Sequence, residues 1–368
     1  MTAEAEPLIQ PAPPRIAAPS RLVSLDAYRG FIMLLLVSHG FGFAVFKSYP
    51  NLAWLAGQVD HAAWEGCTFW DLIQPAFTFM VGMAMPLAAA KRAAEGASAA
   101  GILKHVLWRA LMLIVLSNVL SNFNGNKPPT FQLINVLCQI AIGYVLCHLI
   151  LQLPFRAQIG AAAAMLALHW GLFVMFPGPD GPFSKTGNIG GVLDLKLLGY
   201  NYSGYYTTLN ALGNAVTILF GCWAGLLMRS DRDHGQRLRI LGACAAAALA
   251  IGLALQPFNP MVKRLWTTSF CFFSAGWVIL MLMAFYWIVD VKGYKRWTFP
   301  LIVTGMNSIF IYSFSQVLSG WLRKGIGNLT WNFGFLGDLG AIPVNLLTMA
   351  AMWYMCYWLH RRRIYFKL

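Results

Sequence analysis

The chain has 368 residues, of which 58% are hydrophobic and only 11% are charged, whereas a soluble domain carries about 25% charged residues. This composition excludes an ordinary soluble domain. The net charge of +14 does not indicate nucleic-acid binding, because the basic residues collect in alternate loops, which is the pattern of membrane topology.

Apolar segments near the length of a membrane-spanning helix, about 20 residues, recur along the whole chain. We place them at 28–46, 68–90, 103–121, 131–151, 158–176, 208–228, 237–255, 266–289, 297–317 and 340–360. The sequence therefore predicts an all-α, polytopic integral membrane helical bundle with about ten transmembrane helices. Residues 1–20, rich in Pro and Ala, are predicted to form a disordered cytoplasmic tail, and residues 21–368 a single transmembrane domain.

The basic residues favour an orientation with both termini in the cytoplasm. With the N-terminus inside, 19 of the 27 Lys and Arg residues fall on the cytoplasmic side. This excess follows the positive-inside rule and requires an even number of spans. It places long outer loops at 47–67 and 177–207, and we predict that the second forms a polar and aromatic lid.

The segment from His61 to residue 82 carries the residues best suited to chemistry, because ionisable groups near bilayer depth are expensive and face a cavity or a partner. Asp60 precedes His61, Glu65 follows four residues on, and Asp71 lies ten residues on. His61 and Glu65 would share a face if this segment were helical. A carboxylate that accepts from one ring nitrogen leaves the other as a base or as an acyl acceptor. The alternative is an interfacial histidine that holds the loop to the helix.

Other polar groups lie inside or beside predicted spans. His39 lies in the first span and Asn307 in the ninth, where each is either a hydrogen-bonding group of the packing or part of a site. Pro75 is predicted to kink the second span, and the GxxxG spacing of Gly221 and Gly225 predicts close helix packing. The seven cysteines form no CxxC pair, and no metal spacing is present, so neither a disulfide framework nor a metal site is predicted.

Six segments together carry a family resemblance. They are RLVSLDAYRGFIMLLL (21–36), HAAWEGCTFWDLIQPAFTFMVG (61–82), ILFGCWAGLLMR (218–229), KRLWTTSF (263–270), FYWIVDVKGYKRW (285–297) and GMNSIFIYS (305–313). In this order and spacing, the chain resembles the heparan-α-glucosaminide N-acetyltransferase family, including its bacterial members. Two positions depart from the family pattern: His39 stands where members often have Asn, and Gln132, Cys138 and Gln139 replace arginine-containing positions of the fourth span.

The resemblance implies a transmembrane acetyltransferase of a bacterial inner membrane, active as a homodimer. It would move an acetyl group from cytoplasmic acetyl-CoA to the amine of a glucosamine-like sugar on the periplasmic side. His61 matches the family's active histidine and would act as acyl acceptor or as general base. The predicted catalytic set is His61, Asp71, Glu65, Asp60 and His39. The predicted donor-binding set is Arg29, Arg92, Arg109, Lys292, Arg296 and Asn307, and the predicted acceptor-binding set is Trp64, Trp266 and Lys263.

A transporter for amino sugars, without any chemistry, is the alternative function. Broken helices, midplane polar groups and aromatic loops also suit a transporter. Transporters commonly repeat one half of the chain in the other, and the sequence has no repeat of this kind. The enzyme is therefore the favoured interpretation.

Overall fold

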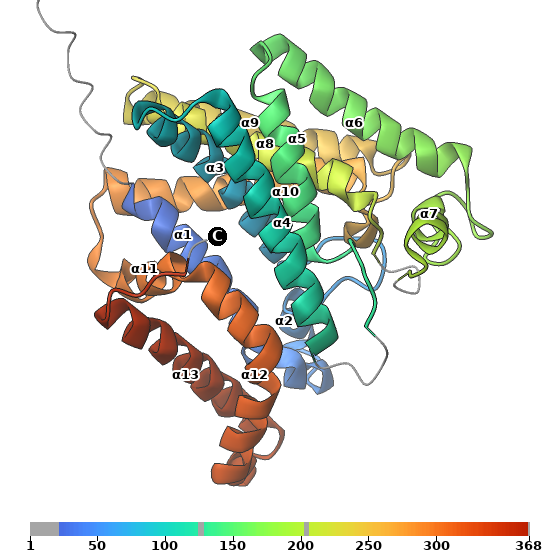
Figure 1. The fold of residues 1–368 in the computed structure, drawn as a ribbon. Helices are drawn as coiled ribbons and strands as arrows, with labels where there is room; N and C mark the ends of the chain where they lie inside the picture. Colours follow the sequence, from blue (N-terminus) through green and yellow to red (C-terminus); the bar gives the residue numbers. More distant parts are fainter. Residues whose placement is uncertain (1–21, 124–128, 202–205, 367–368) are drawn as a thin grey trace, which may run out of the picture.

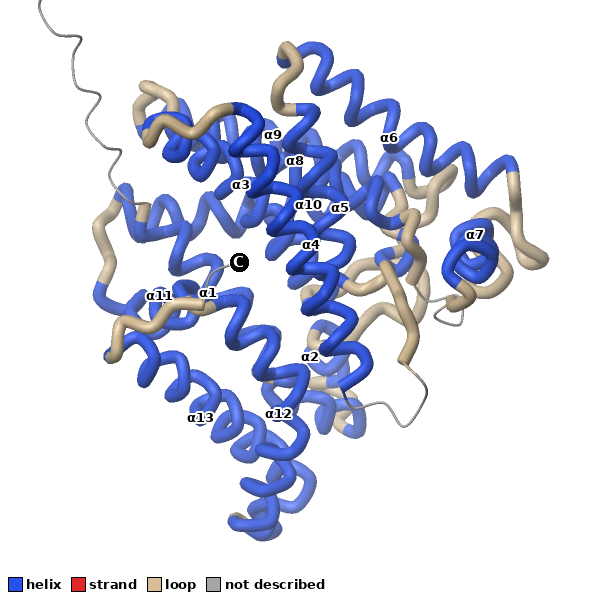
Figure 2. The backbone as a smooth tube through the Cα atoms, in the orientation of Figure 1, coloured by secondary structure: helices blue, strands red, loops and turns tan. Residues whose placement is uncertain are grey.

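The computed structural model describes residues 22–123, 129–201 and 206–366, and these residues fold into helices joined by loops (Figures 1 and 2). No β-strand occurs in these ranges, and the extended pairings they contain are two isolated bridges, Gly66–Val262 and Gly178–Gly181. The predicted all-α fold is confirmed. The tail predicted at 1–20 lies outside the described residues.

Long helices build the bundle, and short helical segments join or extend them. The long helices are α1 (Val23–Val37), α3 (Ile73–Ala94), α4 (Ala99–Phe123), α5 (Val136–Ile150), α6 (Phe155–Met175), α8 (Asn210–Arg229), α9 (His234–Leu255), α10 (Thr268–Phe285), α12 (Ser308–Leu329) and α13 (Ala341–Arg361). The short segments are η1 (His39–Ser48), α2 (Ala53–Gln58), η2 (Trp70–Leu72), α7 (Ile189–Leu198), η3 (Lys263–Leu265), η4 (Tyr286–Val291, a π-helix), η5 (Arg296–Thr298), α11 (Phe299–Met306) and η6 (Trp331–Gly340).

Length and composition make this a multi-pass membrane protein. Among the described residues, seven helical segments are long and apolar enough to cross a membrane, and up to nine if each of two bent pairs is one span. The bent pairs are α1 with η1 (50°) and η5–α11 with α12 (71°), and α5 is a shorter apolar helix. Each predicted span overlaps one of these segments. The count of about ten spans and the orientation remain predictions.

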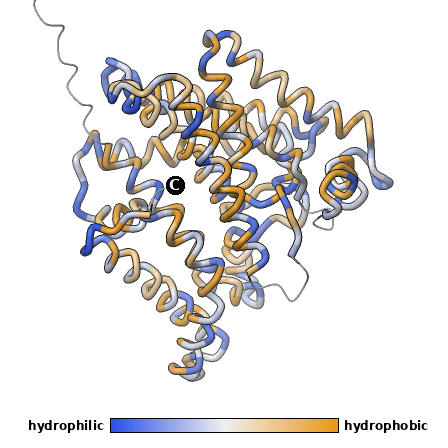
Figure 3. The backbone as a smooth tube through the Cα atoms, viewed as in Figure 1, coloured by the Kyte–Doolittle hydropathy of each residue, from blue (hydrophilic) through white to orange (hydrophobic). Residues whose placement is uncertain are grey.

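Different helices and loops lie at the two ends of the bundle. The start of α1, the connection from α10 to α11 and the end of α13 lie on the same side of the molecule, and α7 lies on the opposite side (Figure 1). Polar residues gather at helix ends and in loops, while the helix middles are hydrophobic (Figure 3). The start of α1 and the end of α13 therefore lie at the same end of the bundle (Figure 1).

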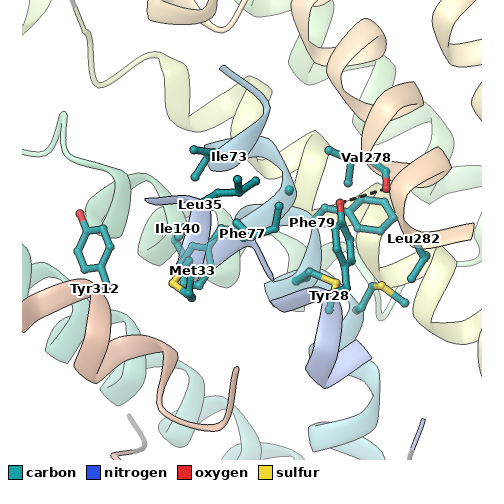
Figure 4. Close-up of a cluster of buried hydrophobic side chains, with 14 of the residues drawn as sticks. Tyr28, Met33, Leu35, Ile73, Phe77, Phe79, Ile140, Val278, Leu282 and Tyr312 are labelled. Atoms are coloured by element: carbon teal, nitrogen blue, oxygen red, sulfur yellow. Dashed lines mark hydrogen bonds between the residues drawn. The ribbon is translucent and has the colours of Figure 1, made fainter. Parts of the chain in front are cut away.

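The main core joins α1, α3 and α10 (Figure 4). Tyr28 is fully buried, and its hydroxyl donates to the carbonyl oxygen of Val278 at 3.2 Å. On the other side of α3, Gly82 and Gly221 allow close approach to α8, because a Cβ on either would collide with the backbone of the facing helix. The predicted packing role of Gly221 is confirmed. Packing on both sides thus fixes α3, the helix that follows Asp71.

The start of the second span differs from the prediction. The helix α3 begins at Ile73, so Pro75 lies in its first turn. A proline there loses no intrahelical hydrogen bond, because the first-turn N–H groups have no helical acceptor. The predicted kink at Pro75 is therefore wrong, while Pro86 lies in the helix interior.

Candidate active site

The loop that carries His61 is tied to the loop between α9 and α10. The Gly66 amide donates to the carbonyl oxygen of Met261 at 2.8 Å, and Gly66 pairs with Val262 in one parallel bridge. Gly66 has a φ of 112°, which favours glycine. Residues 61–69 are not helical, so His61 and Glu65 do not share a helical face, and Glu65 is exposed to solvent. The tie instead brings Lys263 toward His61.

One oxygen of the Asp71 carboxylate is held by the local backbone. Oδ2 accepts from the amides of Ala62 and Thr68 and from the Thr68 hydroxyl, each at 3.1 Å. The Asp71 amide donates back to the Thr68 hydroxyl at 3.3 Å. This reciprocal pattern resembles a capping box and lies one residue ahead of Phe69, the N-cap of η2. A carboxylate near a helix start is also favoured by the helix dipole. The carboxylate therefore has one orientation.

The other oxygen of Asp71 faces two side chains. Oδ1 lies 2.7 Å from Nδ1 of His61 and 3.3 Å from Nζ of Lys263, and Nζ lies 3.1 Å from the same Nδ1. The side chain of Asp71 is 1% exposed, that of Lys263 8% and that of His61 37%. A carboxylate at this distance favours the tautomer in which Nδ1 carries the proton. Nε2 of His61 then keeps its lone pair, on a ring that solvent reaches.

Burial and charge shift the pKa values of the groups around this carboxylate. Burial lowers the pKa of the Lys263 amine, and the Asp71 carboxylate opposes that shift. Burial raises the pKa of the Cys67 thiol to about 12, and the negative charge of Asp71 adds to this effect. In both cases burial is the larger cause, and the Asp71 charge is the second.

Asp60 supports the loop and not the imidazole. Its Oδ2 forms an exposed ion pair with Nζ of Lys47 at 2.8 Å, and its Oδ1 accepts from the backbone amide of His61 at 2.8 Å. The hydrogen bond from Lys47 is the main cause that lowers the Asp60 pKa. Of the three carboxylates near His61 in sequence, Asp71 is the one that the structure places on its ring.

The predicted acceptor-binding tryptophans lie in different surroundings. The indole N–H of Trp64 donates to the carbonyl oxygen of Phe183, in the predicted lid, at 3.0 Å, and its ring packs against a small core formed by the lid and the Lys263 loop. Trp266 is fully buried, and its N–H donates to the hydroxyl of Thr217 at 3.2 Å. Trp64 therefore borders the site, whereas Trp266 supports the loop after Lys263 from inside.

His39 lies in a left-handed turn beside the His61 loop. Residues 39–42 all have positive φ values, from 49° at His39 to 77° at Gly42. A Cβ on Gly40 would lie 3.1 Å from the carbonyl oxygen of Val59. The turn therefore packs against Val59, which lies two residues before His61 in the chain. The Nε2 atom of His39 is buried without a hydrogen bond among the described residues. The structure does not join His39 to His61 by a hydrogen bond within those residues.

Two of the predicted donor-binding residues are grouped around a cavity of about 260 Å³ lined mainly by α3, α4 and α5. Arg92 lines this cavity, and its Nη2 lies 2.7 Å from Nε2 of His105. Arg109 donates to the hydroxyl of Tyr144, which also lines the cavity, at 3.3 Å. The cavity thus has basic groups and a hydroxyl at its wall.

The remaining donor-binding predictions lie along α1 and the segment from η4 to α12. Arg29 pairs with Asp26 at 3.8 Å, Nζ of Lys292 lies 5.3 Å from the ring centre of Trp287, and Arg296 begins η5. The Asn307 amide binds the C-terminal segment: its Nδ2 donates to the carbonyl oxygen of Ile364 and its Oδ1 accepts from the amide of Phe366. Asn307 therefore holds the end of the chain at the bend between α11 and α12.

Sequence reasoning missed two sets of residues near the site. The first is Thr68, although the spacing Thr-x-x-Asp ahead of an apolar run is a recognisable capping signal. The second is a buried amide network, in which Oε1 of Gln139 accepts from Nε2 of Gln74 at 3.1 Å and from Nδ2 of Asn214 at 3.3 Å. No sequence pattern links residues on three helices, so this network required the structure.

Comparison with known proteins shows which proteins this chain is similar to. The family model described as heparan-α-glucosaminide N-acetyltransferase, catalytic, matches residues 21–180. The protein named heparan-α-glucosaminide N-acetyltransferase of Homo sapiens is 25% identical over 433 residues, which cover 98% of this chain and 62% of that protein. The protein of the same name from Mus musculus is 23% identical over 422 residues, covering 96% of this chain and 61% of that protein. The predicted resemblance to heparan-α-glucosaminide N-acetyltransferases is confirmed.

The match to these acetyltransferases bears differently on the parts of the site. The range 21–180 contains His61 and Asp71, while Lys263 lies beyond it and within the region aligned with the two mammalian relatives. The chain spans less than two thirds of the length of each of those relatives.

Proposed function

We propose that this protein is a transmembrane acetyltransferase that moves an acetyl group from acetyl-CoA to the amine of an amino sugar. The observation that carries the proposal is the His61–Asp71 contact of 2.7 Å on a ring that is 37% exposed. An imidazole oriented through Nδ1 presents Nε2 as a nucleophile or base. The similarity to proteins named as N-acetyltransferases supports acyl transfer as the reaction type.

Nε2 of His61 has two routes to the same products. As an acyl acceptor, Nε2 attacks the thioester carbon, the carbon–sulfur bond breaks, and the sugar amine then attacks the acetyl group held on His61. As a general base, Nε2 removes a proton from the amine while the amine itself attacks the thioester. In both routes Asp71 stabilises the positive charge that forms on the imidazole ring. In each route the acetyl carbon's bond to its carrier, Nε2 or the CoA sulfur, breaks as the new carbon–nitrogen bond forms. The proton lost by the amine ends on the CoA sulfur, so an amide and the CoA thiol result.

Basic residues away from the His61 loop are suited to bind the phosphates of the acetyl donor. CoA carries phosphates, which arginine binds well through its planar guanidinium group. Arg92 lines the cavity between α3, α4 and α5, and Arg109 contacts the lining residue Tyr144. We propose that phosphate groups of the donor contact this basic wall. In the predicted orientation this wall faces the cytoplasm and His61 faces the periplasm of a bacterial inner membrane, so the acetyl group would cross the bilayer within the bundle.

The test is acetyl transfer by the purified protein. Labelled acetyl-CoA is supplied with and without glucosamine, and the label is measured on the protein and on the sugar. We expect transfer to glucosamine that His61→Ala reduces by about 100-fold or more, as loss of a general acid–base group commonly does. Label on wild-type protein without sugar would indicate the acyl-histidine route, and label on sugar alone the direct route.

Two controls make this result specific to the site. His360→Ala removes a histidine at the end of α13, away from the His61 loop, and should keep full activity. Thermal unfolding of His61→Ala in detergent should match that of the wild type, because a partly exposed histidine costs little stability when removed. No His61-dependent label on any of a panel of amines would contradict the enzyme, and uptake of labelled amino sugar into proteoliposomes without CoA would favour the transporter.

A further inference from the structure

The position of Lys263 bears on the charge of the His61 ring. A buried carboxylate beside an imidazole favours the protonated ring, and a protonated ring has no lone pair on Nε2. A site that needs neutral His61 therefore needs something to offset the Asp71 charge. Lys263 is the cation placed to do this: its Nζ lies 3.3 Å from Oδ1 of Asp71, the same oxygen that faces His61.

We infer that Lys263 is a charge-compensating partner of Asp71, which keeps the His61 ring neutral and its Nε2 available. This inference rests on the proposed function for its catalytic meaning, but the charge state of His61 can be measured without any reaction. Lys263 acts through Asp71 and His61, and is thus a positioning residue for the site. The role differs from acceptor binding, because an amine already engaged with Asp71 and 8% exposed is not presented to a sugar.

The geometry of the three groups leaves little choice of hydrogen bonds. If Nδ1 of His61 donates to Asp71, it has no lone pair for Lys263, so the 3.1 Å approach of Nζ to Nδ1 is a contact between two donors that share one acceptor. The positive charge of Lys263 disfavours, by direct repulsion, a positive charge on the imidazole. Lys263 therefore opposes protonation of His61 both directly and by neutralising Asp71.

Among the described residues, the other charged or titratable groups around this cluster are exposed, uncharged at neutral pH, or act on Lys263. Asp60 and Lys47 form an exposed ion pair with each other, and Glu65 is exposed, so water screens their effect on His61. Cys67 is a raised-pKa thiol and carries no charge at neutral pH. Arg264 also acts on Lys263 and disfavours its charge. The buried pair of Asp71 and Lys263 is therefore expected to dominate the protonation of His61.

The experiment measures the protonation of His61 directly. Diethylpyrocarbonate modifies neutral imidazole, and mass spectrometry of the peptide that contains His61 gives its modification rate across a pH series. In Lys263→Gln, which keeps a hydrogen-bond donor but loses the charge, we expect the half-maximal pH to rise by about one unit or more. Lys263→Arg keeps the charge and should keep the wild-type midpoint.

Two comparisons give the measurement its controls. Lys47→Met removes the same charge from the exposed partner of Asp60 and should leave the midpoint unchanged, and His234, which is exposed, serves as an internal reference in every sample. If Lys263→Gln folds poorly, Asp71→Asn is compared with Asp71→Asn combined with Lys263→Met, and the midpoint should be higher in the double variant, which lacks the Lys263 charge. An unchanged His61 midpoint in Lys263→Gln, or an equal rise in Lys263→Arg, would overturn the inference.

Failure of this inference and failure of the proposed function are separable. The diethylpyrocarbonate assay uses no acetyl-CoA and no sugar, so a shifted midpoint with no acetyl transfer would support the charge role of Lys263 and contradict the enzyme. Acetyl transfer with an unshifted midpoint would support the enzyme and leave Lys263 as a tie between two loops. A purely structural Lys263 would lower the unfolding temperature and the rate at every pH without moving the midpoint.

Discussion

At the scale of single residues, the two oxygens of Asp71 have separate tasks. Oδ2 is held by Ala62 and Thr68, and Oδ1 is left for His61 and Lys263. Because the backbone fixes the first oxygen, the second cannot turn away from the imidazole. The hydrogen bonds to Oδ2, formed ahead of α3, therefore set the direction of the candidate catalytic hydrogen bond.

The thiol of Cys67 should report the charge of Asp71. Its pKa is raised to about 12, mainly by burial and secondly by Asp71. A raised thiol pKa leaves less thiolate at a given pH. Alkylation by iodoacetamide at pH 8 should therefore be about 1,000-fold slower than that of a free thiol with a pKa of about 8.5. Asp71→Asn removes the second cause and should speed alkylation while burial still slows it. Mass spectrometry of the Cys67 peptide measures both rates, and Cys67→Ser should lose this signal. Equal rates for Cys67 and the free thiol would contradict the assigned environment.

The choice of partner for His61 marks the limit of sequence reasoning at this scale. His61 stands out in the sequence because a histidine and carboxylates precede an apolar run, and that pattern indicates a site. Helical spacing favoured Glu65, four residues on, whereas the non-helical course of residues 61–69 brings Asp71 to the ring instead. Lys263, about 200 residues away in the chain, reaches the site through the Gly66–Val262 bridge, and a single bridge leaves no pattern in the sequence.

At the scale of elements, the apolar segments were predictable and their bends were not. Membrane length and hydrophobicity place each span, but the bends at His39 and Asn307 depend on tertiary contacts. At the first, a left-handed turn packs on the His61 loop, and at the second, Asn307 binds the C-terminal segment. The helix α7 was also missed, because its 10 residues, IGGVLDLKLL, are too few to span a membrane and do not place apolar and polar residues on separate helical faces.

The crossing of α3 and α8 offers a test of how elements position the site. A Cβ at Gly221 would collide with the backbone of α3 at Phe79, so Gly221→Ala should push apart the two helices and destabilise the fold by about 1–3 kcal/mol. Thermal unfolding in detergent measures the loss. Gly160→Ala on α6 is the matched control, since nothing lies within 4 Å of a Cβ there, and it should leave the unfolding temperature unchanged or slightly higher. Equal behaviour of the two variants would contradict the close packing.

At the scale of the whole molecule, the proposed reaction depends on which end of the bundle faces the cytoplasm. The start of α1 and the end of α13 lie on the side of the connection from α10 to α11 (Figure 1). The predicted topology places 19 of the 27 basic residues on that side. A donor made in the cytoplasm and an acceptor outside it would then meet across the bundle. The arrangement of helices alone fits either orientation, so the excess of basic residues has to decide.

Cysteine labelling in intact cells of an expressing bacterium decides the orientation. Lys185→Cys in the predicted lid and Lys292→Cys after η4 both replace exposed lysines on opposite predicted faces. Because the positive-inside rule places residue 292 in the cytoplasm, a membrane-impermeant maleimide should label Lys185→Cys in intact cells and label Lys292→Cys only after the membrane is opened. The chain without these substitutions has seven cysteines of its own, and its labelling is the baseline to be subtracted. The reverse pattern would place His61 on the same side as the acetyl-CoA pool, and the acetyl group would then have no membrane to cross.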